Sequence, residues 1–265
     1  MHNPVIQSYE NYREEYRLTT NNARKIEWIT TVRIMAEWLM PGSRVLDCAA
    51  GTGVYAFHLA DTGHQVTATD LTPRHIALIR AQLKNRGRSM ETAVLDATDL
   101  SVFADRSFDA VLNMGPMYHL VEKEQREKCI SESVRVLKQG GLLFCTYIPR
   151  YFVFQHVAMT DSRFLDPRLA RQLIETGVLR HSDEKCFWTD TYYAAPAEIE
   201  ALLAAQNLTI IDHFAQDGLA PTFSKTADQW DKEQFRIWCE YHYSICREPS
   251  VLGATNHAMI IGKKL

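Results

Sequence analysis

The residues that could do chemistry begin in the segment Val45-Leu-Asp-Cys-Ala-Ala-Gly-Thr-Gly-Val-Tyr55. Gly51 and Gly53 lack a Cβ, so the backbone there can take left-handed angles and approach a ligand closely. Asp47 lies four residues before the first glycine, where its charge would repel a pyrophosphate and attract a cationic amino group. The segment therefore predicts a turn that binds a small ligand carrying an amino group.

Two more carboxylates end the next two apolar runs. Asp70 ends the run 65–70, where a carboxylate can accept hydrogen bonds from both hydroxyls of a ribose. Asp96 ends the run 92–96 and is suited to accept a hydrogen bond from the amino group of adenine. Asp47 and Asp96 could instead each stabilise a turn, but the ordered series favours contact with a ligand.

His119 is the candidate catalytic base, because it follows the run 108–113 at the sheet edge where open α/β sheets bind ligands. An imidazole can be tuned to accept a proton near neutral pH. Tyr118 could shape the same pocket or donate a hydrogen bond to the substrate. A structural role inside the loop is an equally good interpretation of both side chains.

These side chains need a scaffold that brings several strand ends together. Between residues 41 and 148, short apolar runs alternate with helical patterns. One helix is predicted to begin at Thr72-Pro73, which supplies an N-cap and a proline in the first turn, and to end at Gly87. Strands that alternate with helices of this kind indicate βαβ units and a parallel sheet.

The remaining elements of the sheet follow the same alternation. A helix is predicted over about 122–138, with Gly140-Gly141 as its end. The apolar runs 208–214 and 257–262 are expected to be the strands that complete the sheet. The predicted fold class is α/β.

Taken in order, these motifs resemble those of the class I S-adenosylmethionine-dependent methyltransferases, notably their small-molecule branch. The motifs that carry the resemblance are 45–53, Asp70, Asp96, 108–120 and 136–143. The resemblance covers about residues 40–148. It implies a Rossmann-like, seven-stranded, mostly parallel sheet with helices on both faces, and S-adenosylmethionine as the cofactor.

The resemblance also implies which positions bind the cofactor, ordered along its length. The methionine moiety would lie against Asp47, Ala49, Gly51 and Gly53, the ribose against Asp70, the adenine against Leu71, Asp96 and Ala97, and the sulfonium near Asn113 and Met114.

Three segments outside the motifs are expected to be helical caps on a single domain, 1–265, with the core at 41–148. They are the N-terminal cap 1–40 and the insertions 151–193 and 215–250, and they hold 19 of the 27 aromatic side chains. These rings could line a ligand pocket or simply pack against the scaffold. In the last segment, Thr226 and Gln229 form a capping-box pattern that predicts a helix start.

The candidate substrate contacts come mostly from these caps. Tyr9, Tyr12 and Tyr16 are spaced by three and four, so they would share one face of the first helix, and Tyr16 is the one expected to bind substrate. Met117, in the loop after 108–113, and His242 are the other two candidates. The tyrosines could close over the cofactor, but packing against the sheet is the simpler expectation.

Composition limits the classes of partner. With 265 residues, 46% hydrophobic content and a formal net charge of −3, the chain is expected to fold and to lack generic attraction to nucleic acid or membranes. It has no apolar run long enough for a membrane span and no signal-peptide pattern. The six cysteines form no C-x-x-C pair, which favours free thiols in the cytoplasm and gives no metal site. A small-molecule methyl acceptor is expected, while the oligomeric state stays open.

Several alternatives remain at this stage. The segment Gly51-Thr-Gly-Val-Tyr-Ala56 also fits the dinucleotide pattern, so an NAD(P)-dependent oxidoreductase is one rival. A non-catalytic S-adenosylmethionine-binding regulatory module is another. The segment Asn113-Met-Gly-Pro-Met-Tyr118 lacks the second proline typical of enzymes that methylate adenine or glutamine nitrogen. Oxygen, nitrogen and sulfur all remain open as the accepting atom.

Overall fold

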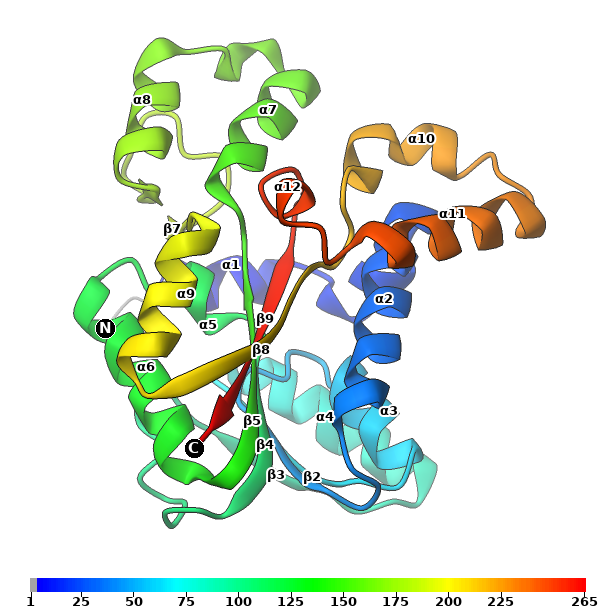
Figure 1. Ribbon diagram of the computed structural model, residues 1–265, viewed down its shortest axis with the longest axis vertical. Coiled ribbons are helices and arrows are strands. Elements are labelled where there is room, and N and C mark those ends of the chain that lie inside the picture. Colours follow the sequence, from blue (N-terminus) through cyan, green and yellow to red (C-terminus); the bar gives the residue numbers. More distant parts are fainter. Residues whose placement is uncertain (1–3) are drawn as a thin grey trace.

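A seven-stranded sheet forms the centre of the molecule (Figure 1) and confirms the predicted fold class. The computed structural model describes residues 4–265 apart from the side chain of Asn11, so the first three residues of the expected N-terminal cap lie outside it. The strand order is β3-β2-β1-β4-β5-β9-β8, and β9 alone runs antiparallel to its neighbours. The strands are β1 (Arg44–Asp47), β2 (Gln65–Asp70), β3 (Glu91–Val94), β4 (Phe108–Asn113), β5 (Leu137–Tyr147), β8 (Leu208–Ala215) and β9 (Ala258–Lys264).

Helices cover both faces of the sheet because its strands are apolar on both sides. Val45 and Leu46 are both fully buried and belong to different core clusters, one on each face. One face packs against α2 (Asn22–Trp38), α3 (Val54–Asp61) and α4 (Pro73–Arg86), and the other against α6 (Lys123–Val136) and α9 (Pro196–Ala205).

The strand order creates the place for a ligand. From β1 the chain steps outward through β2 to β3, and it then returns to β4 on the other side of β1. The crevice outside the carboxyl ends of β1 and β4 is therefore the switch point at which open α/β sheets bind ligands. The loop after β4 contributes the short helix α5 (Pro116–His119) to this edge.

Structure outside the sheet comes from the N-terminus and from two insertions (Figure 1). The N-terminal segment forms α1 (Pro4–Asn11) and the 3₁₀ helix η1 (Glu14–Thr19). The first insertion forms α7 (Arg150–Thr160), η2 (Ser162–Phe164), α8 (Pro167–Glu175) and the small sheet of β6 (Val178–Leu179) and β7 (Thr191–Tyr192). The second forms η3 (Ala220–Phe223), α10 (Ser224–Ala227) and α11 (Lys232–Ile245), followed by α12 (Pro249–Leu252). None of the helices within residues 4–265 is long and apolar enough to cross a membrane.

The prediction that one N-terminal helix holds Tyr9, Tyr12 and Tyr16 is wrong. The helix α1 stops at Asn11, and Tyr16 lies in η1, so Tyr9, Tyr12 and Tyr16 share no helical face. Arg74 gives a physical reason, because its guanidinium donates to the carbonyl oxygens of Tyr9 and Tyr12 at 3.4 and 3.1 Å. Carbonyl groups at the end of a helix lack partners within the helix, and Arg74 supplies a donor for them.

Two other helix boundaries also differ from expectation. The helix α11 begins after Asp231, whose Oδ1 accepts from the backbone N–H of Gln234 while the Gln234 side chain accepts from the N–H of Asp231. The capping box is therefore Asp231 with Gln234 and not Thr226 with Gln229, because aspartate is a strong N-cap.

The glycine pair after α6 does not end that helix. The helix already ends at Val136, and Gly140-Gly141 lie inside β5, where the pairing register with β4 shifts. Gly140 takes φ +74° in this irregular stretch, an angle that a side chain would disfavour. The glycine pair therefore lies at an irregularity in the strand. The helical pattern that precedes the pair made it resemble a helix end.

Candidate functional site

A cavity of about 450 Å³ opens at the carboxyl edge of the sheet. Its wall is built by the turns after β1, β2 and β3, by the loop after β4, and by the N-terminal segment 4–18. Ten of the predicted site residues line it, namely Asp47, Ala49, Gly51, Asp70, Leu71, Asp96, Ala97, Met114, Tyr118 and His119. Their contact with a ligand stays a prediction, but the geometry brings them to one space.

Asp70 joins the glycine turn to the start of α4. Its Oδ2 accepts from the backbone N–H of Gly51 at 2.8 Å, and its Oδ1 accepts from that of Thr72 at 2.7 Å. His75 Nδ1 lies 3.1 Å from the same Oδ1. A carboxylate has about four acceptor positions, so Asp70 fixes the turn and keeps capacity for a ligand hydroxyl at the cavity wall.

Asp96 combines both roles that the sequence left open. Its Oδ1 accepts from the backbone N–H of Thr98 at 2.8 Å, which is the turn-stabilising contact. The residue is otherwise exposed and lines the cavity, so its second oxygen remains available to a ligand.

Asp47 is a carboxylate without a cation beside it. It is 2% exposed, and burial together with the nearby charge of Asp70 raises its pKa from 3.8 to about 7, although the backbone N–H of Ala49 opposes the shift. A buried acid of this kind is stabilised in its charged form by an arriving cation. The turn after β1 is therefore suited to an ammonium group.

His119 is held in one tautomer. Its Nδ1 lies 3.3 Å from the carbonyl oxygen of Asp190, which can only accept, so Nδ1 carries the proton. Its Nε2 then accepts from the hydroxyl of Tyr9 at 2.9 Å. Burial lowers the pKa of His119 to about 4, so the imidazole is neutral near pH 7 and only weakly basic.

The structure adds site residues that the sequence analysis missed. Arg17 lines the cavity and donates to Glu14 and to both oxygens of Glu27, at 2.7 to 2.8 Å. Burial opposes its charge, but these carboxylates hold the pKa of Arg17 above its ordinary value. Among the described lining residues, Arg17 is the one lysine or arginine. No sequence motif identifies Arg17, because its position at the cavity depends on how the N-terminal segment packs against the rest of the protein.

For Tyr9 the sequence analysis favoured packing against the sheet over contact with the cofactor. Tyr9 lines the cavity and packs edge-on against His75, His119 and Trp188, with ring centroids 5.4 to 6.2 Å apart. The neighbouring Tyr118 is half-buried, and the loss of solvent around its hydroxyl raises its pKa. The cavity end beside His119 is therefore aromatic.

Three predicted residues near the strand ends do not line the cavity. The side chain of Asn113 turns into the core, where Nδ2 lies 3.1 Å from Cys129 Sγ and 3.3 Å from Ser133 Oγ. Met117 is fully buried in the core on the α6 side of the sheet. Gly53, at φ +88°, serves packing, because a Cβ there would lie 3.0 Å from Phe57. Side chains of successive strand residues alternate between faces, which carries Asn113 away from the crevice.

Two predicted substrate contacts in the caps are also not at the cavity wall. Tyr16 is 52% exposed on η1. His242 is buried, and its Nε2 lies 3.2 and 3.3 Å from the carbonyl oxygens of Ala215 and Gln216. Aromatic content therefore gave a poor guide to the pocket, because residues 215–250 pack their rings against α2 and each other.

Buried polar atoms at the cavity fit a polar ligand. Thr52 Oγ1 and His75 Nε2 are buried without a hydrogen-bond partner among the described residues, and both residues line the cavity. Unpaired buried polar atoms cost free energy unless a ligand or water satisfies them. Together with the aspartates and Arg17, they suit a ligand with hydroxyl, amino and carboxyl groups, as S-adenosylmethionine has.

Comparison with known proteins points the same way. Residues 45–141 match the family model described as a methyltransferase domain. The chain is 31% identical to a glycine/sarcosine N-methyltransferase from Parasynechococcus marenigrum over 52% of each chain. It is 38% identical to a demethylmenaquinone methyltransferase from Clavibacter sepedonicus, over 45% of this chain and 46% of the relative. The matches thus span about half the length of these two relatives.

Solved structures share the fold. A SAM-dependent methyltransferase from Methanosarcina mazei superimposes with a TM-score of 0.62 at 20% identity, covering 88% of this chain and 97% of that one. The likeness in fold therefore extends beyond the segment 45–141 that the family model matches.

Proposed function

We propose that this chain, whose residues 45–141 match a methyltransferase-domain model, is a class I S-adenosylmethionine-dependent methyltransferase that transfers the methyl group to an oxygen, nitrogen or sulfur atom of a small molecule. The observation that carries the proposal is the convergence of Asp47, Asp70 and Asp96 on one cavity. Carboxylates at three successive strand ends match the amino group, the ribose and the adenine of this cofactor.

Each part of the cofactor has a proposed partner. Asp47 would pair with the ammonium group. Arg17 would bind the carboxylate through N–H groups that its bonds to Glu27 do not use. Asp70 would accept from the ribose hydroxyls and Asp96 from the adenine amino group, with Leu71 beside the ring. The pocket would thereby orient the cofactor from both ends.

The bound cofactor supplies an electrophilic methyl group on a sulfonium. When the methyl group is transferred, the rest of the cofactor is the leaving group and becomes a neutral thioether. The protein contributes alignment, and holding two reactants in line can lower a barrier by about 7–11 kcal/mol. Tyr9 lies at the cavity wall, where its hydroxyl oxygen would accept a hydrogen bond from the acceptor while its proton is donated to His119 Nε2. Because His119 is a weak base, the site suits an acceptor atom whose lone pair is available without proton transfer to a strong base.

The acceptor is proposed to be small, since the cavity must also hold the cofactor. The relatives are named for glycine/sarcosine and for demethylmenaquinone, which are different small molecules, so they leave the accepting atom open. We place the reaction in a single domain with its core at 41–148 and caps at 1–40, 151–193 and 215–250. The six cysteines are all unpaired, which favours a reducing compartment such as the cytoplasm.

Calorimetric titration tests the proposal. S-adenosylhomocysteine should bind the wild-type protein, whereas NAD⁺ and NADH should not. Asp70→Ala should weaken S-adenosylhomocysteine binding about 10- to 150-fold, because a charged acceptor worth about 1.5–3 kcal/mol is lost. Asp99→Ala, on an exposed aspartate outside the cavity wall, is the matched control and should bind normally. Binding of NAD⁺ without S-adenosylhomocysteine would reject the proposal.

A further inference from the structure

The guanidinium of Arg17 is fixed by two carboxylates, those of Glu14 and Glu27. Its Nη1 and Nη2 donate to the two carboxylate oxygens of Glu27 at 2.7 and 2.8 Å, and its Nε donates to Glu14 at 2.8 Å. Arginine has five N–H groups, so two remain for a ligand. The direction in which those two point depends on where Glu27 holds the guanidinium plane.

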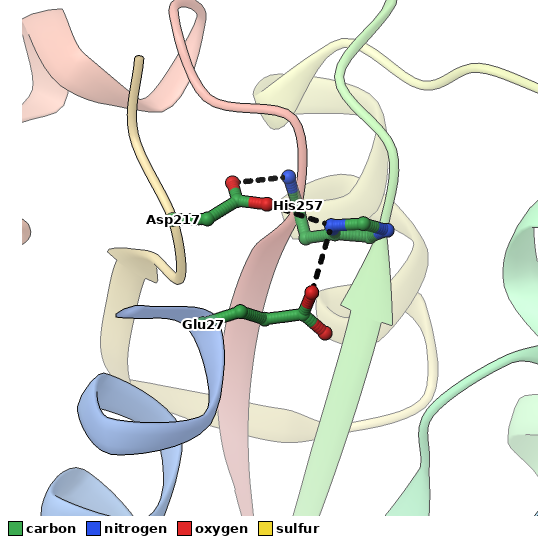
Figure 2. Close-up of side chains that lie close together, drawn as sticks. All are labelled: Glu27, Asp217 and His257. Atoms are coloured by element: carbon green, nitrogen blue, oxygen red, sulfur yellow. Dashed lines mark hydrogen bonds and ion pairs between the residues drawn. The ribbon is translucent and has the colours of Figure 1, made fainter. Parts of the chain in front are cut away.

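Glu27 is itself an unusual residue to find inside the protein. It lies within α2 and is 2% exposed, and Figure 2 shows its carboxylate directed at His257. Burial would raise the pKa of Glu27, but the charge of Arg17 and the neighbouring His257 hold it below its ordinary value. Glu27 is therefore charged, as its role as a partner of Arg17 requires.

His257 and Asp217 continue the contacts beyond Glu27. His257 Nδ1 lies 3.5 Å from Glu27 and 2.9 Å from Asp217. Asp217 is fixed in turn, because its Oδ1 accepts from the backbone N–H of His257 and from Thr255 Oγ1, each at 2.8 Å. The ends of β8 and β9 thus hold a buried set of groups that reaches the cavity through Arg17.

The same three side chains have the composition of a metal site. One ligand atom from each of Glu27, Asp217 and His257 lies within 4.8 Å of the others. Both Glu27 oxygens already accept from Arg17, however, and His257 Nδ1 already pairs with Asp217. These groups satisfy one another, so the arrangement fits a series of mutual contacts better than a set of free ligands.

We propose that Glu27, His257 and Asp217 are positioning residues that aim Arg17 at the carboxylate of the cofactor's methionine moiety. The inference rests on the proposed function. It predicts that a change at Asp217, which does not line the cavity, alters affinity for one end of the cofactor only.

Two ligands separate that end from the rest. S-adenosylhomocysteine contains the amino and carboxyl groups, whereas 5′-methylthioadenosine keeps the adenosine and sulfur without them. Arg17→Gln should weaken binding of the first roughly 10- to 100-fold and leave the second within about twofold. Glu27→Gln and Asp217→Asn, both close in shape to the wild type, should each give a selective loss of roughly 3- to 30-fold. The ratio of the two affinities is the readout, because general loosening of the fold would lower both.

A matched control and a double variant complete the test. Asp212→Asn changes another buried aspartate, whose partners are Arg247 and Trp38, and it should leave the ratio unchanged. In an Arg17→Gln background, Asp217→Asn should add no further selective loss. An unchanged ratio in folded Glu27→Gln or folded Asp217→Asn, or a loss that persists in the double variant, would overturn the inference. Failure of both ligands to bind the wild type would instead refute the proposed function.

Discussion

At the scale of single residues, Asp47 shows how a binding site conflicts with stability. The carboxylate is buried beside Asp70, and its pKa is raised from 3.8 to about 7. Keeping it charged therefore costs folding free energy until a cation arrives. A protein with no ligand for this place would be more stable with an uncharged side chain there.

Asp47→Asn should therefore stabilise the ligand-free protein and weaken cofactor binding. Because the folded-state pKa exceeds the unfolded value, wild-type stability falls as pH rises from about 4 to 7 and stays low above. The variant lacks this loss, so its free energy of unfolding should exceed that of the wild type by about 1–3 kcal/mol at pH 8. This range lies below the full linkage of roughly 1.4 kcal/mol per pKa unit. The difference should vanish near pH 4. Denaturant melts at both pH values measure it.

Cofactor binding should be weakened by the same substitution that stabilises the ligand-free protein. Asp47→Asn should lower affinity for S-adenosylhomocysteine roughly tenfold at pH 8, since a charge-assisted contact to the ammonium group is lost. An equal gain in stability at pH 4 and pH 8 would contradict the assigned pKa. Unchanged affinity would remove Asp47 from the site.

At the scale of elements, the short helix α1 relies on contacts with the rest of the molecule. An eight-residue helix is not stable by itself in water, so it must be held by tertiary contacts. Tyr9 supplies several of them, through its hydroxyl bond to His119 and its ring contacts with His75 and Trp188. The helix that covers one side of the cavity is thus tied to the loop after β4.

Tyr9→Phe should loosen α1 without unfolding the protein. The variant keeps the ring and loses one hydrogen bond worth about 1 kcal/mol, so amide hydrogen exchange within α1 should quicken roughly fivefold. Tyr12→Phe is the control, since Tyr12 is 42% exposed and outside the cavity wall. Equal exchange in Tyr9→Phe and wild type would show that the bond does not hold the helix.

At the scale of the whole molecule, the site is assembled from segments that are distant in sequence. The N-terminal segment, the first three strand ends, the loop after β4 and residue 190 all meet at one cavity. Because the unfolded chain has no such site, ligand binding should stabilise the entire fold.

S-adenosylhomocysteine at 100 times its dissociation constant should add about 2.7 kcal/mol of stability. For a chain of this size, that gain should raise the melting temperature by roughly 5–10 °C in a thermal-shift assay. NAD⁺ at the same concentration should cause no shift. Equal shifts from both ligands would indicate nonspecific binding.

The sequence alone determined the sheet and the residues at its strand ends. The bounds of β2 and β4 match the apolar runs 65–70 and 108–113, and Asp70 lies at the cavity as predicted. These features are local, because a buried parallel strand needs a continuous apolar run and its last residue is fixed by where that run stops. The alternation of strands and helices then brings the strand ends to one edge.

Only the tertiary structure decided which residues of the caps and loops face the cavity. Arg17 and Tyr9 reach it through contacts with Glu27 and His119, and the contact with His119 joins residues 110 positions apart in the chain. Tyr16 and His242 looked suitable by type, yet one is exposed and the other is buried against backbone carbonyls. Residue type and spacing fix which groups a segment can offer, whereas long-range packing fixes where each group points.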